Sequence, residues 1–355
     1  MKLCAMTRLL LASTLCWVGP ASAQSCSYHN GMTAPYQLSL PLQGNITVGA
    51  DVPDGTVVYY GGHSAGVSGQ TRCGGGDGEA RWDYLWLRAP GMPVPGRPGV
   101  YPTGIPGIGI RYLSRAGATM PVRYGVLPIR PDYYISNIAT QFTFNLIKTG
   151  PVSPGTLQGS TLPTIRWTLS WGPGTGLDLW HANVQGQLNI VTGTCNVRDI
   201  DVPLGNFAQR SFTGVGRVSG WVEHAIELSG CPAFFGKARS YIREDGGVVE
   251  DIAGRRDNAL GVRLDPTTAI IDHGRSIMAV QEYPNNQAAR GLGIQVAGPA
   301  DSSFGFGVFR DSGLSLTETA NGRYSIPLRA RYIQMEDRVR PGPANGAMVV
   351  TLRYE

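Results

Sequence analysis

The chain has 355 residues, a length that suits two domains of about 150 residues each. Its formal net charge is only +5 and it has no basic run of five or more residues, which argues against a nucleic-acid-binding protein. Its 49 glycines and 25 prolines are spread along the chain rather than gathered in one linker, a pattern typical of short strands separated by turns.

Residues 1–23 have the pattern of a secretory signal peptide. The N-terminal segment carries two basic residues, Lys2 and Arg8, before the apolar run 9–18. The sequence ASA at 21–23 provides a small-residue cleavage site. Cleavage after Ala23 leaves 332 residues with 28 basic and 25 acidic side chains, a net charge of +3. No later stretch approaches the ~18 apolar residues of a membrane span, so we expect an exported, soluble protein.

Four cysteines follow the signal peptide, and an even number in an oxidising compartment favours two disulfides. Three pairings are possible. The cysteines nevertheless fall into two couples, 47 and 36 residues apart, with a gap of 122 residues between the couples. One bridge per domain is therefore expected, each worth ~3 to 4 kcal/mol in the chain-entropy model. The expected bridges are Cys26–Cys73 and Cys195–Cys231.

The stretch VVYYGGHSAGVSG at 57–69 contains the G-x-S-x-G pattern of a hydrolase nucleophile elbow around Ser64. That motif needs a strand that turns directly into a helix, whereas residues 65–82 contain six glycines and no helical pattern. We therefore interpret 57–69 as a strand that runs into a glycine-rich loop near Cys73. The sequence predicts a protein that is not an enzyme, and a secreted serine hydrolase is a weak alternative.

The histidines show no i, i+4 pair and no Cys/His ligand spacing, so we expect neither a metal nor another cofactor. One weak alternative is a zinc ion held by His29, His63 and His181, which all fall in the first domain.

Alternating apolar and polar residues predict half-buried antiparallel strands over 138–148, 164–171, 222–228, 325–333 and 347–355. No window of a dozen residues has a convincing 3.6-residue period, although 248–260 has room for one or two helical turns. The proline-rich stretch 88–109 is expected to form an ordered surface loop. Many short strands with Gly/Pro turns indicate an all-β protein built of sandwich or barrel domains.

The second half carries a specific set of motifs. TGTCNVRDIDVPLGNF is followed by IELSGCP and by the ending YSIPLRARYIQMEDRVRPGPANGAMVVTLRYE. Together these segments resemble the pilin domain of chaperone–usher fimbriae. The matching positions are Cys195, V-x-L-G at 202–205, Cys231, P-L-x-A-R-Y at 327–332, V-x-x-G at 339–342 and the penultimate aromatic Tyr354.

This resemblance implies that residues 192–355 form an incomplete immunoglobulin-like sandwich that lacks its last strand. The missing strand is then supplied first by a periplasmic chaperone and later by the adjacent fimbrial subunit, at an outer-membrane usher. Without that strand an apolar groove and an unpaired edge are exposed, which favours aggregation. The residues implied in chaperone and donor-strand recognition are Met348, Val350, Leu352, Tyr354 and the C-terminal Glu355.

A polymerising pilin has a donor strand before its first cysteine, whereas residues 24–191 form a whole additional domain here. This arrangement resembles the two-domain tip adhesins of type 1-like fimbriae, in which the first domain is a lectin-like, receptor-binding sandwich. The segment DYLWL after Cys73 resembles a sugar-binding segment of those adhesins, which implies Asp83 and Asp77 as sugar-binding carboxylates.

The segment RWDYLW also has the residue types of a sugar site. Trp82 and Tyr84 lie on one face of the expected strand, where aromatic rings stack on sugars, and Asp83 lies on the other. A plain core stripe is the alternative interpretation of the aromatic residues.

The sequence thus predicts a tip adhesin that leaves the cell through the periplasm and lies at the fimbrial tip on the cell surface. Its expected receptor is on a host or other surface and is a carbohydrate. A non-adhesive structural tip or adaptor subunit is the main alternative.

Overall fold

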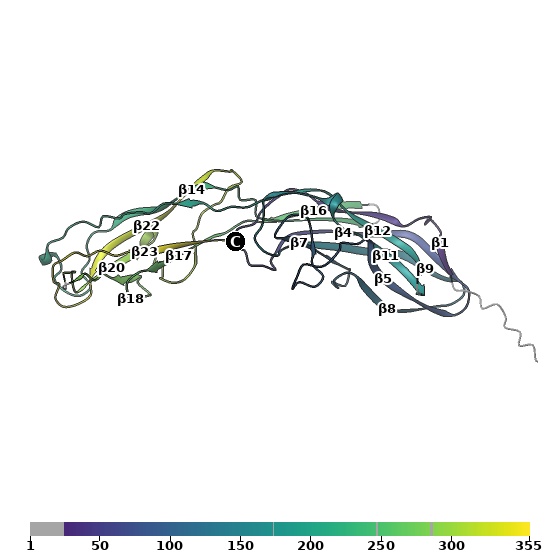
Figure 1. Ribbon diagram of the computed structural model, residues 1–355, viewed down its shortest axis with the longest axis horizontal. Helices are drawn as coiled ribbons and strands as arrows, with labels where there is room; N and C mark the ends of the chain where they lie inside the picture. Colours follow the sequence, from purple (N-terminus) through teal and green to yellow (C-terminus); the bar gives the residue numbers. More distant parts are fainter. Residues whose placement is uncertain (1–24, 173, 246–247, 285–286) are drawn as a thin grey trace, which may run out of the picture.

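The protein consists of two β-sandwiches arranged end to end in an elongated molecule (Figure 1). The computed structural model describes residues 25–172, 174–245, 248–284 and 287–355, so the predicted signal peptide lies outside the described residues. Within these described residues, helical structure is limited to short turns such as Gly159–Thr161, Gln209–Ser211 and Pro299–Asp301. In the described ranges no helix is long and apolar enough to cross a membrane. The predicted all-β fold is confirmed.

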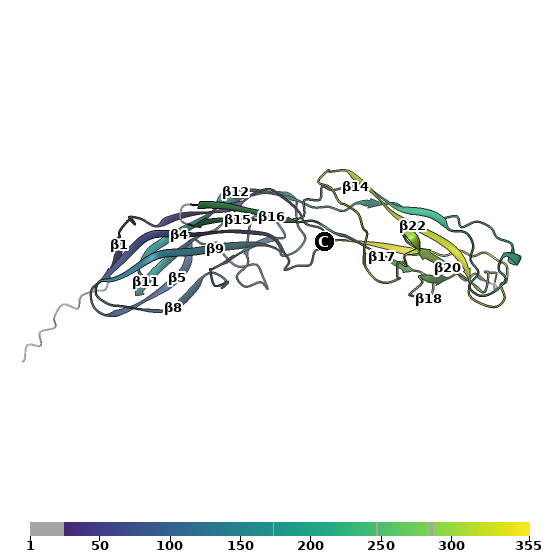
Figure 2. The ribbon, with the colours of Figure 1, turned by 180° about the vertical axis from the view of Figure 1, so that it is seen from behind.

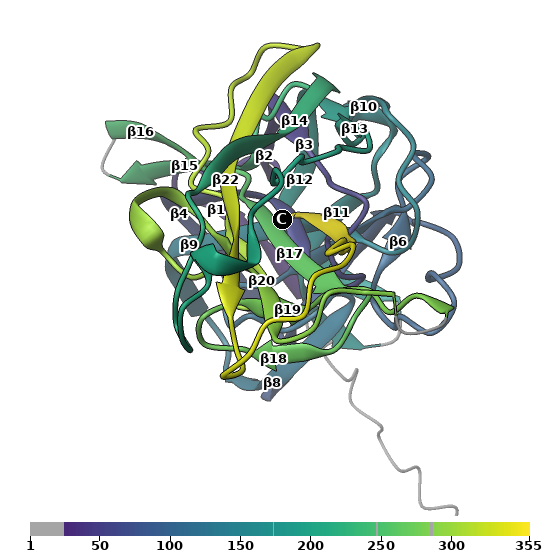
Figure 3. The ribbon, with the colours of Figure 1, turned by 90° about the vertical axis from the view of Figure 1, so that its left-hand side faces the viewer.

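The first sandwich contains two seven-stranded sheets. In the view down the long axis, this sandwich lies behind the strands of the second one (Figure 3). One sheet has the order β16-β15-β4-β9-β7-β6, with β1 paired to β4, and the other has the order β10-β12-β11-β5-β8, with β2 and β3 paired to β12. The strands of the first sheet are β1 (Ser25–His29), β4 (Val57–Gly74), β6 (Tyr101–Pro102), β7 (Ile108–Leu113), β9 (Tyr133–Lys148), β15 (Lys237–Asp245) and β16 (Val248–Arg256). Those of the second are β2 (Tyr36–Leu42), β3 (Asn45–Thr47), β5 (Gly78–Arg88), β8 (Val122–Ile129), β10 (Gly155–Gln158), β11 (Thr164–Gly172) and β12 (Thr175–Val191).

Alternate side chains of these strands fill the space between the two sheets. Phe142 and Phe144 on β9 are fully buried, as is Leu169 on β11. The ring of Phe142 lies 5.4 Å from that of Tyr84 on β5, so aromatic contacts join one sheet to the other. Full burial of one such side chain contributes about 1.5–3 kcal/mol. The strands predicted at 138–148 and 164–171 are confirmed.

The second sandwich has a six-stranded and a three-stranded sheet around a separate core. Ile226, Val262 and Ile326 are buried in that core. The larger sheet consists of β13 (Asn196–Val197), β14 (Val222–Cys231), β22 (Gly322–Gln334), β20 (Leu292–Ala297), β19 (Ile277–Ala279) and β18 (Ile270–Asp272), in that order. The smaller consists of β21 (Arg310–Asp311), β17 (Leu260–Pro266) and β23 (Met348–Tyr354).

A hairpin from the second half of the chain is part of the first sheet. β15 and β16 pair antiparallel, and β15 pairs parallel with β4, from Ala238 opposite Tyr59 to Glu244 opposite Ala65. Figure 2 shows the hairpin lying along the first sandwich. The predicted domain boundary near residue 191 remains a proposal. It assigns the hairpin to the second domain, whereas the hairpin pairs with a strand of the first sandwich. The helical turns considered for 248–260 are wrong, because the ladder with β15 makes 248–256 a strand.

The glycine-rich loop predicted within 57–69 is also wrong, because β4 continues as a strand to Gly74. The glycines serve packing instead. A Cβ at Gly61 would collide with the ring of Phe144, and one at Gly62 would come within 2.6 Å of the ring of Tyr241 on β15. Glycine therefore lets one aromatic ring of the core and one of the hairpin lie directly on the strand.

Both predicted disulfides are present, and each lies within one sandwich. Cys26 and Cys73 are directly opposite each other on β1 and β4. Cys195 precedes β13 and joins Cys231 at the end of β14.

The two sandwiches meet at Thr47, the last residue of β3, whose side chain is buried. Its hydroxyl donates a hydrogen bond to the carbonyl of Ala233 at 2.7 Å and accepts one from the N–H of Phe235 at 2.9 Å. Its own backbone N–H donates to Gly236, and its carbonyl accepts from the side chain of Asn258. Thr47 thus supplies hydrogen-bond partners along the whole segment 233–236, which leads into the hairpin.

Replacing Thr47 by valine, which has the same shape but no hydroxyl, should destabilise the protein by about 1–3 kcal/mol, because it leaves a buried N–H and a buried carbonyl without their partner. Urea unfolding followed by fluorescence measures the change. Thr267→Val is the matched control, since its exposed hydroxyl donates to one carbonyl, that of Ala347, and water can replace it. Equal stabilities of the two variants would contradict this role of Thr47.

Candidate functional site

The C-terminal strand β23 has one open edge. It pairs antiparallel with β17, from Leu260 opposite Tyr354 to Pro266 opposite Met348, and it is the last strand of its sheet. Among the described residues no strand pairs with its other edge. Backbone N–H and carbonyl groups along such an edge can pair with an added strand.

The apolar side chains of β23 face an incompletely covered core. Met348, Val350 and Leu352 pack against the core cluster of the second sandwich yet are only partly buried, whereas Val349, on the other face, is 56% exposed. The segment 198–208, which follows β13, forms no strand. The second sandwich therefore combines an open strand edge with apolar side chains beside it, as the sequence predicts for a strand-accepting domain.

The end of β23 is held between the two sandwiches, where Figure 1 places the C-terminus. Tyr354 is buried, and its hydroxyl accepts a hydrogen bond from the N–H of Cys195 at 3.0 Å. Its backbone N–H donates to the carboxylate of Asp51 in the first sandwich at 3.3 Å, and burial raises the pKa of its phenol. The backbone carbonyl of Glu355 accepts from Ala259 and from the side chain of Asn258. The last two residues are therefore also part of the seam between the sandwiches.

The residues predicted to bind a receptor do not share one surface. Trp82 and Tyr84 lie on the inner face of β5, whereas Asp83 lies on the outer face and is only 3% exposed. One carboxylate oxygen of Asp83 is 3.9 Å from the guanidinium of Arg123, and the other is buried without a hydrogen-bond partner in the described structure. Asp77 is exposed in the turn between β4 and β5. Asp83 and the aromatic pair therefore cannot contact the same ligand.

Trp82 and Tyr84 instead line an aromatic groove of about 400 Å³. The ring of Trp167 lies 5.0 Å from Trp82 and 5.7 Å from Tyr84, and Tyr124 and Arg115 complete the wall. The sequence placed Trp167 on the apolar face of its strand. It gave no sign that this residue lies beside β5, because the pairing of strands separated by about 80 residues cannot be read from alternation. Stacked rings beside a guanidinium provide a surface that binds the apolar face of a ligand.

A cluster of polar side chains lies around Asp178, on the outer face of the sheet that contains β5, β11 and β12. Its carboxylate accepts a hydrogen bond from Thr168 at 2.6 Å and lies 3.0 Å from His181 and 3.5 Å from Arg166. Partial burial favours the neutral acid, but the hydrogen bond from Thr168 and the contacts with His181 and Arg166 outweigh it and hold the pKa of Asp178 below its ordinary value. This cluster fixes β11 to β12.

The three histidines considered as zinc ligands have separate partners. His29 packs against Tyr134, His181 contacts Asp178, and the buried His63 lies 2.8 Å from the carbonyl of Ser39 and 3.1 Å from Glu244 on the hairpin. In the described part of the chain no three His, Cys, Asp or Glu side chains form a group that could hold a metal ion. Ser64 lies in the middle of β4, with no helix behind it.

These features define an elongated all-β protein with an aromatic groove and a polar cluster on the first sandwich and an open strand edge on the second. No protein-family model matches the chain. A curated Klebsiella pneumoniae protein named "Fimbria adhesin protein" is 26% identical over 272 residues, which make up 74% of this chain and 74% of that protein. The predicted resemblance to fimbrial adhesins is confirmed, and this relative is an adhesin rather than an enzyme.

Two solved structures are also similar. The receptor binding domain of the adhesin MrkD1P of Klebsiella pneumoniae covers 50% of this chain with its entire length, at 21% identity and a TM-score of 0.35. The CupB6 tip adhesin from Pseudomonas aeruginosa aligns over 92% of this chain and 93% of its own, at 17% identity and a TM-score of 0.34.

Replacing Asp178 by asparagine should destabilise the protein by about 1–3 kcal/mol at pH 7, since it removes a charged hydrogen-bond acceptor from the cluster. The folded-state pKa of Asp178 is below its ordinary value of 3.8, so this stabilisation is present above pH 3.8 and is lost as the pH falls through the folded-state value. Urea unfolding at pH 7, 5 and 3 should therefore show wild type and variant converging in acid. Asp77→Asn, with an exposed carboxylate, should stay within about 0.5 kcal/mol of wild type. A destabilisation by Asp178→Asn that is the same at all three pH values would refute the role of its charge.

Proposed function

We propose that this chain is the tip adhesin of a chaperone–usher fimbria and attaches bacteria to receptors on host or other surfaces. The observation that carries the proposal is the similarity to a fimbria adhesin over 74% of the chain. The open edge of β23 supports it, because a fimbrial subunit needs a place at which a neighbouring chain adds a strand.

Assembly follows from the shape of the second sandwich. A periplasmic chaperone adds a strand beside β23, and at the outer-membrane usher the adjacent subunit replaces that strand with its own N-terminal extension. The added strand covers Met348, Val350 and Leu352 and supplies hydrogen-bond partners for the open edge. A whole sandwich precedes the second one, at the position where a polymerising subunit carries its donor strand, and this supports a position at the fimbrial tip on the cell surface.

The first sandwich is the receptor-binding part in this proposal, and the receptor is a carbohydrate. Trp82 is a candidate for contact with a sugar because it lines the aromatic groove and is only partly buried, whereas the buried Tyr84 supports the wall of that groove. Asp77 is a candidate because it is exposed, whereas the buried position of Asp83 restricts it to supporting the surface through its neighbours.

Expressed in the periplasm without its chaperone, the protein should be largely insoluble, because an apolar strand edge then remains open. Co-expression with the cognate chaperone should restore soluble protein and raise the unfolding temperature. The amount of soluble protein and the thermal unfolding curve measure both effects. Equal yield and stability with and without a donor strand would rule out this mechanism of assembly.

A charge placed under the added strand tests its position. Val350→Asp should weaken chaperone binding about 100-fold, because an aspartate would be buried without a partner. Val349→Asp is the matched control on the same strand, since its side chain points away from the core, and it should bind as wild type does. Circular dichroism of the chaperone complexes verifies that both variants fold. Similar losses in the two variants would contradict the proposed docking of the strand.

Adhesion separates this function from the alternative of a structural tip subunit. Cells that carry fimbriae without this protein should lose attachment to a panel of glycans and extracellular-matrix proteins and regain it when the chain is restored. An adaptor without a receptor predicts fimbriae that are altered in length or number while attachment stays the same.

A further inference from the structure

A polar groove lies on the first sandwich, where the parallel pairing of β2 and β3 with β12 is interrupted. The ladder stops at Leu42, opposite Gly186, and resumes at Asn45, opposite Asn189. Gly186 has a φ of 94°, and a Cβ there would collide with the carbonyl of Leu42, so glycine allows the two strands to approach while the backbone turns. The interruption leaves a groove of about 760 Å³.

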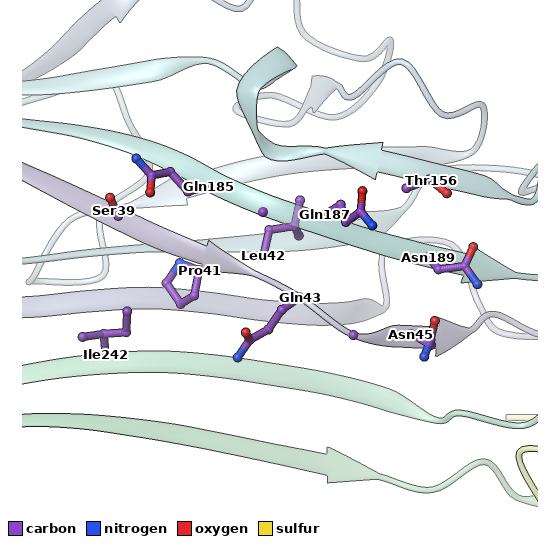
Figure 4. A pocket seen from close by; sticks show the side chains of 12 residues that line it. Ser39, Pro41, Leu42, Gln43, Asn45, Thr156, Gln185, Gln187, Asn189 and Ile242 are labelled. Carbon is purple, nitrogen blue, oxygen red and sulfur yellow. The ribbon is translucent and has the colours of Figure 1, made fainter.

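Neutral amide side chains line this groove from both strands, as Figure 4 shows. No charged residue lies among those that line it in the described structure. The five amides are all exposed, and they are Gln43, Asn45, Gln185, Gln187 and Asn189. Such a cluster on adjacent strands differs from the charged side chains that keep most protein surfaces soluble.

Most of this hydrogen-bonding capacity is free for a ligand. Gln187 accepts a hydrogen bond from Gln158 at 3.1 Å, and Gln43 donates one to Ser240 on the hairpin at 3.0 Å. Within the described residues no side-chain hydrogen bond is made by the other three, Asn45, Gln185 and Asn189.

The groove also has an apolar wall. Pro41 lies beside the amides, and Ile242 on β15 faces them from the hairpin (Figure 4). Ile242 belongs to the second half of the sequence, so the groove is complete only when the hairpin is docked on the first sandwich.

We propose that this groove binds a neutral oligosaccharide. A primary amide offers an acceptor and two donors, which match sugar hydroxyls that both donate and accept, while the apolar wall suits the C–H face of a sugar ring. The absence of charged lining residues disfavours sialylated or sulfated ligands. Gln185 and Asn189 are four residues apart on β12, a span of about 13 Å, which suits a short oligosaccharide better than a single ring. This inference rests on the adhesin function proposed above, and its site is separate from the aromatic groove.

The test uses the full mature chain in complex with its chaperone. An array of neutral, sialylated and sulfated oligosaccharides, together with collagen-derived peptides, identifies a ligand, and calorimetry measures its affinity. Wild type should bind a neutral oligosaccharide, and Asn45→Ala and Asn189→Ala should each weaken binding about tenfold, the effect of losing one or two hydrogen bonds. Gln70→Ala, an amide of the same sandwich outside the groove, should leave binding unchanged.

Three results would overturn this inference. Binding that survives both asparagine substitutions but is lost in Trp82→Ala assigns the ligand to the aromatic groove. Binding of peptides or acidic glycans alone contradicts the ligand class. Binding of nothing on the array by a chain that still restores attachment of fimbriated cells overturns the groove while the proposed adhesin function stands, whereas loss of attachment as well would overturn both.

Discussion

Strand β23 has to bury the apolar side chains of Met348, Val350 and Leu352, yet among the described residues it has only one neighbouring strand. The second sandwich therefore carries a core that its own chain does not cover. In the proposed assembly, the free energy of covering that core becomes available when another chain supplies a strand, so completion of the fold and assembly would be one event. The proposed position at the tip has the same origin, since the additional sandwich stands where a polymerising subunit carries its donor strand.

The first sandwich and the open edge of β23 belong to a connected structure. The hydroxyl of Thr47 donates a hydrogen bond to Ala233 and accepts one from Phe235. The carboxylate of Asp51 accepts a hydrogen bond from the N–H of Tyr354 on β23, the strand with which a neighbouring subunit would pair in the proposed assembly. The hairpin adds a parallel ladder, in which residues 238–244 of β15 pair with β4. In the proposed adhesin, force on a receptor bound to the first sandwich would reach the second sandwich through these hydrogen-bonded contacts.

Local patterns predicted much of the fold. Alternation gave the strands at 138–148 and 164–171, and cysteine spacing gave both disulfides. The failures involve contacts between distant residues. Gly61 and Gly62 indicated a loop by composition, but the rings of Phe144 and Tyr241 make them strand residues, and nothing near β4 in the sequence announces Tyr241. Gln185, Gln187 and Asn189 lie outside the predicted strands, and only the return of β2 and β3 turns their exposed face of β12 into a groove.

The position of the hairpin also affects how such a chain can be divided or recombined. If the chain is divided near residue 191, strand β4 of the first part loses its neighbour β15. The second part then carries the β15–β16 hairpin without the sheet on which it packs. Exchange of receptor specificity between adhesins would have to move residues 237–256 together with residues 25–191, two separate stretches of one gene. Recombination at a single point near residue 191 would separate these two stretches and is therefore disfavoured. Residues 25–191 are expected to evolve together with residues 237–256, which are encoded within the second half of the gene.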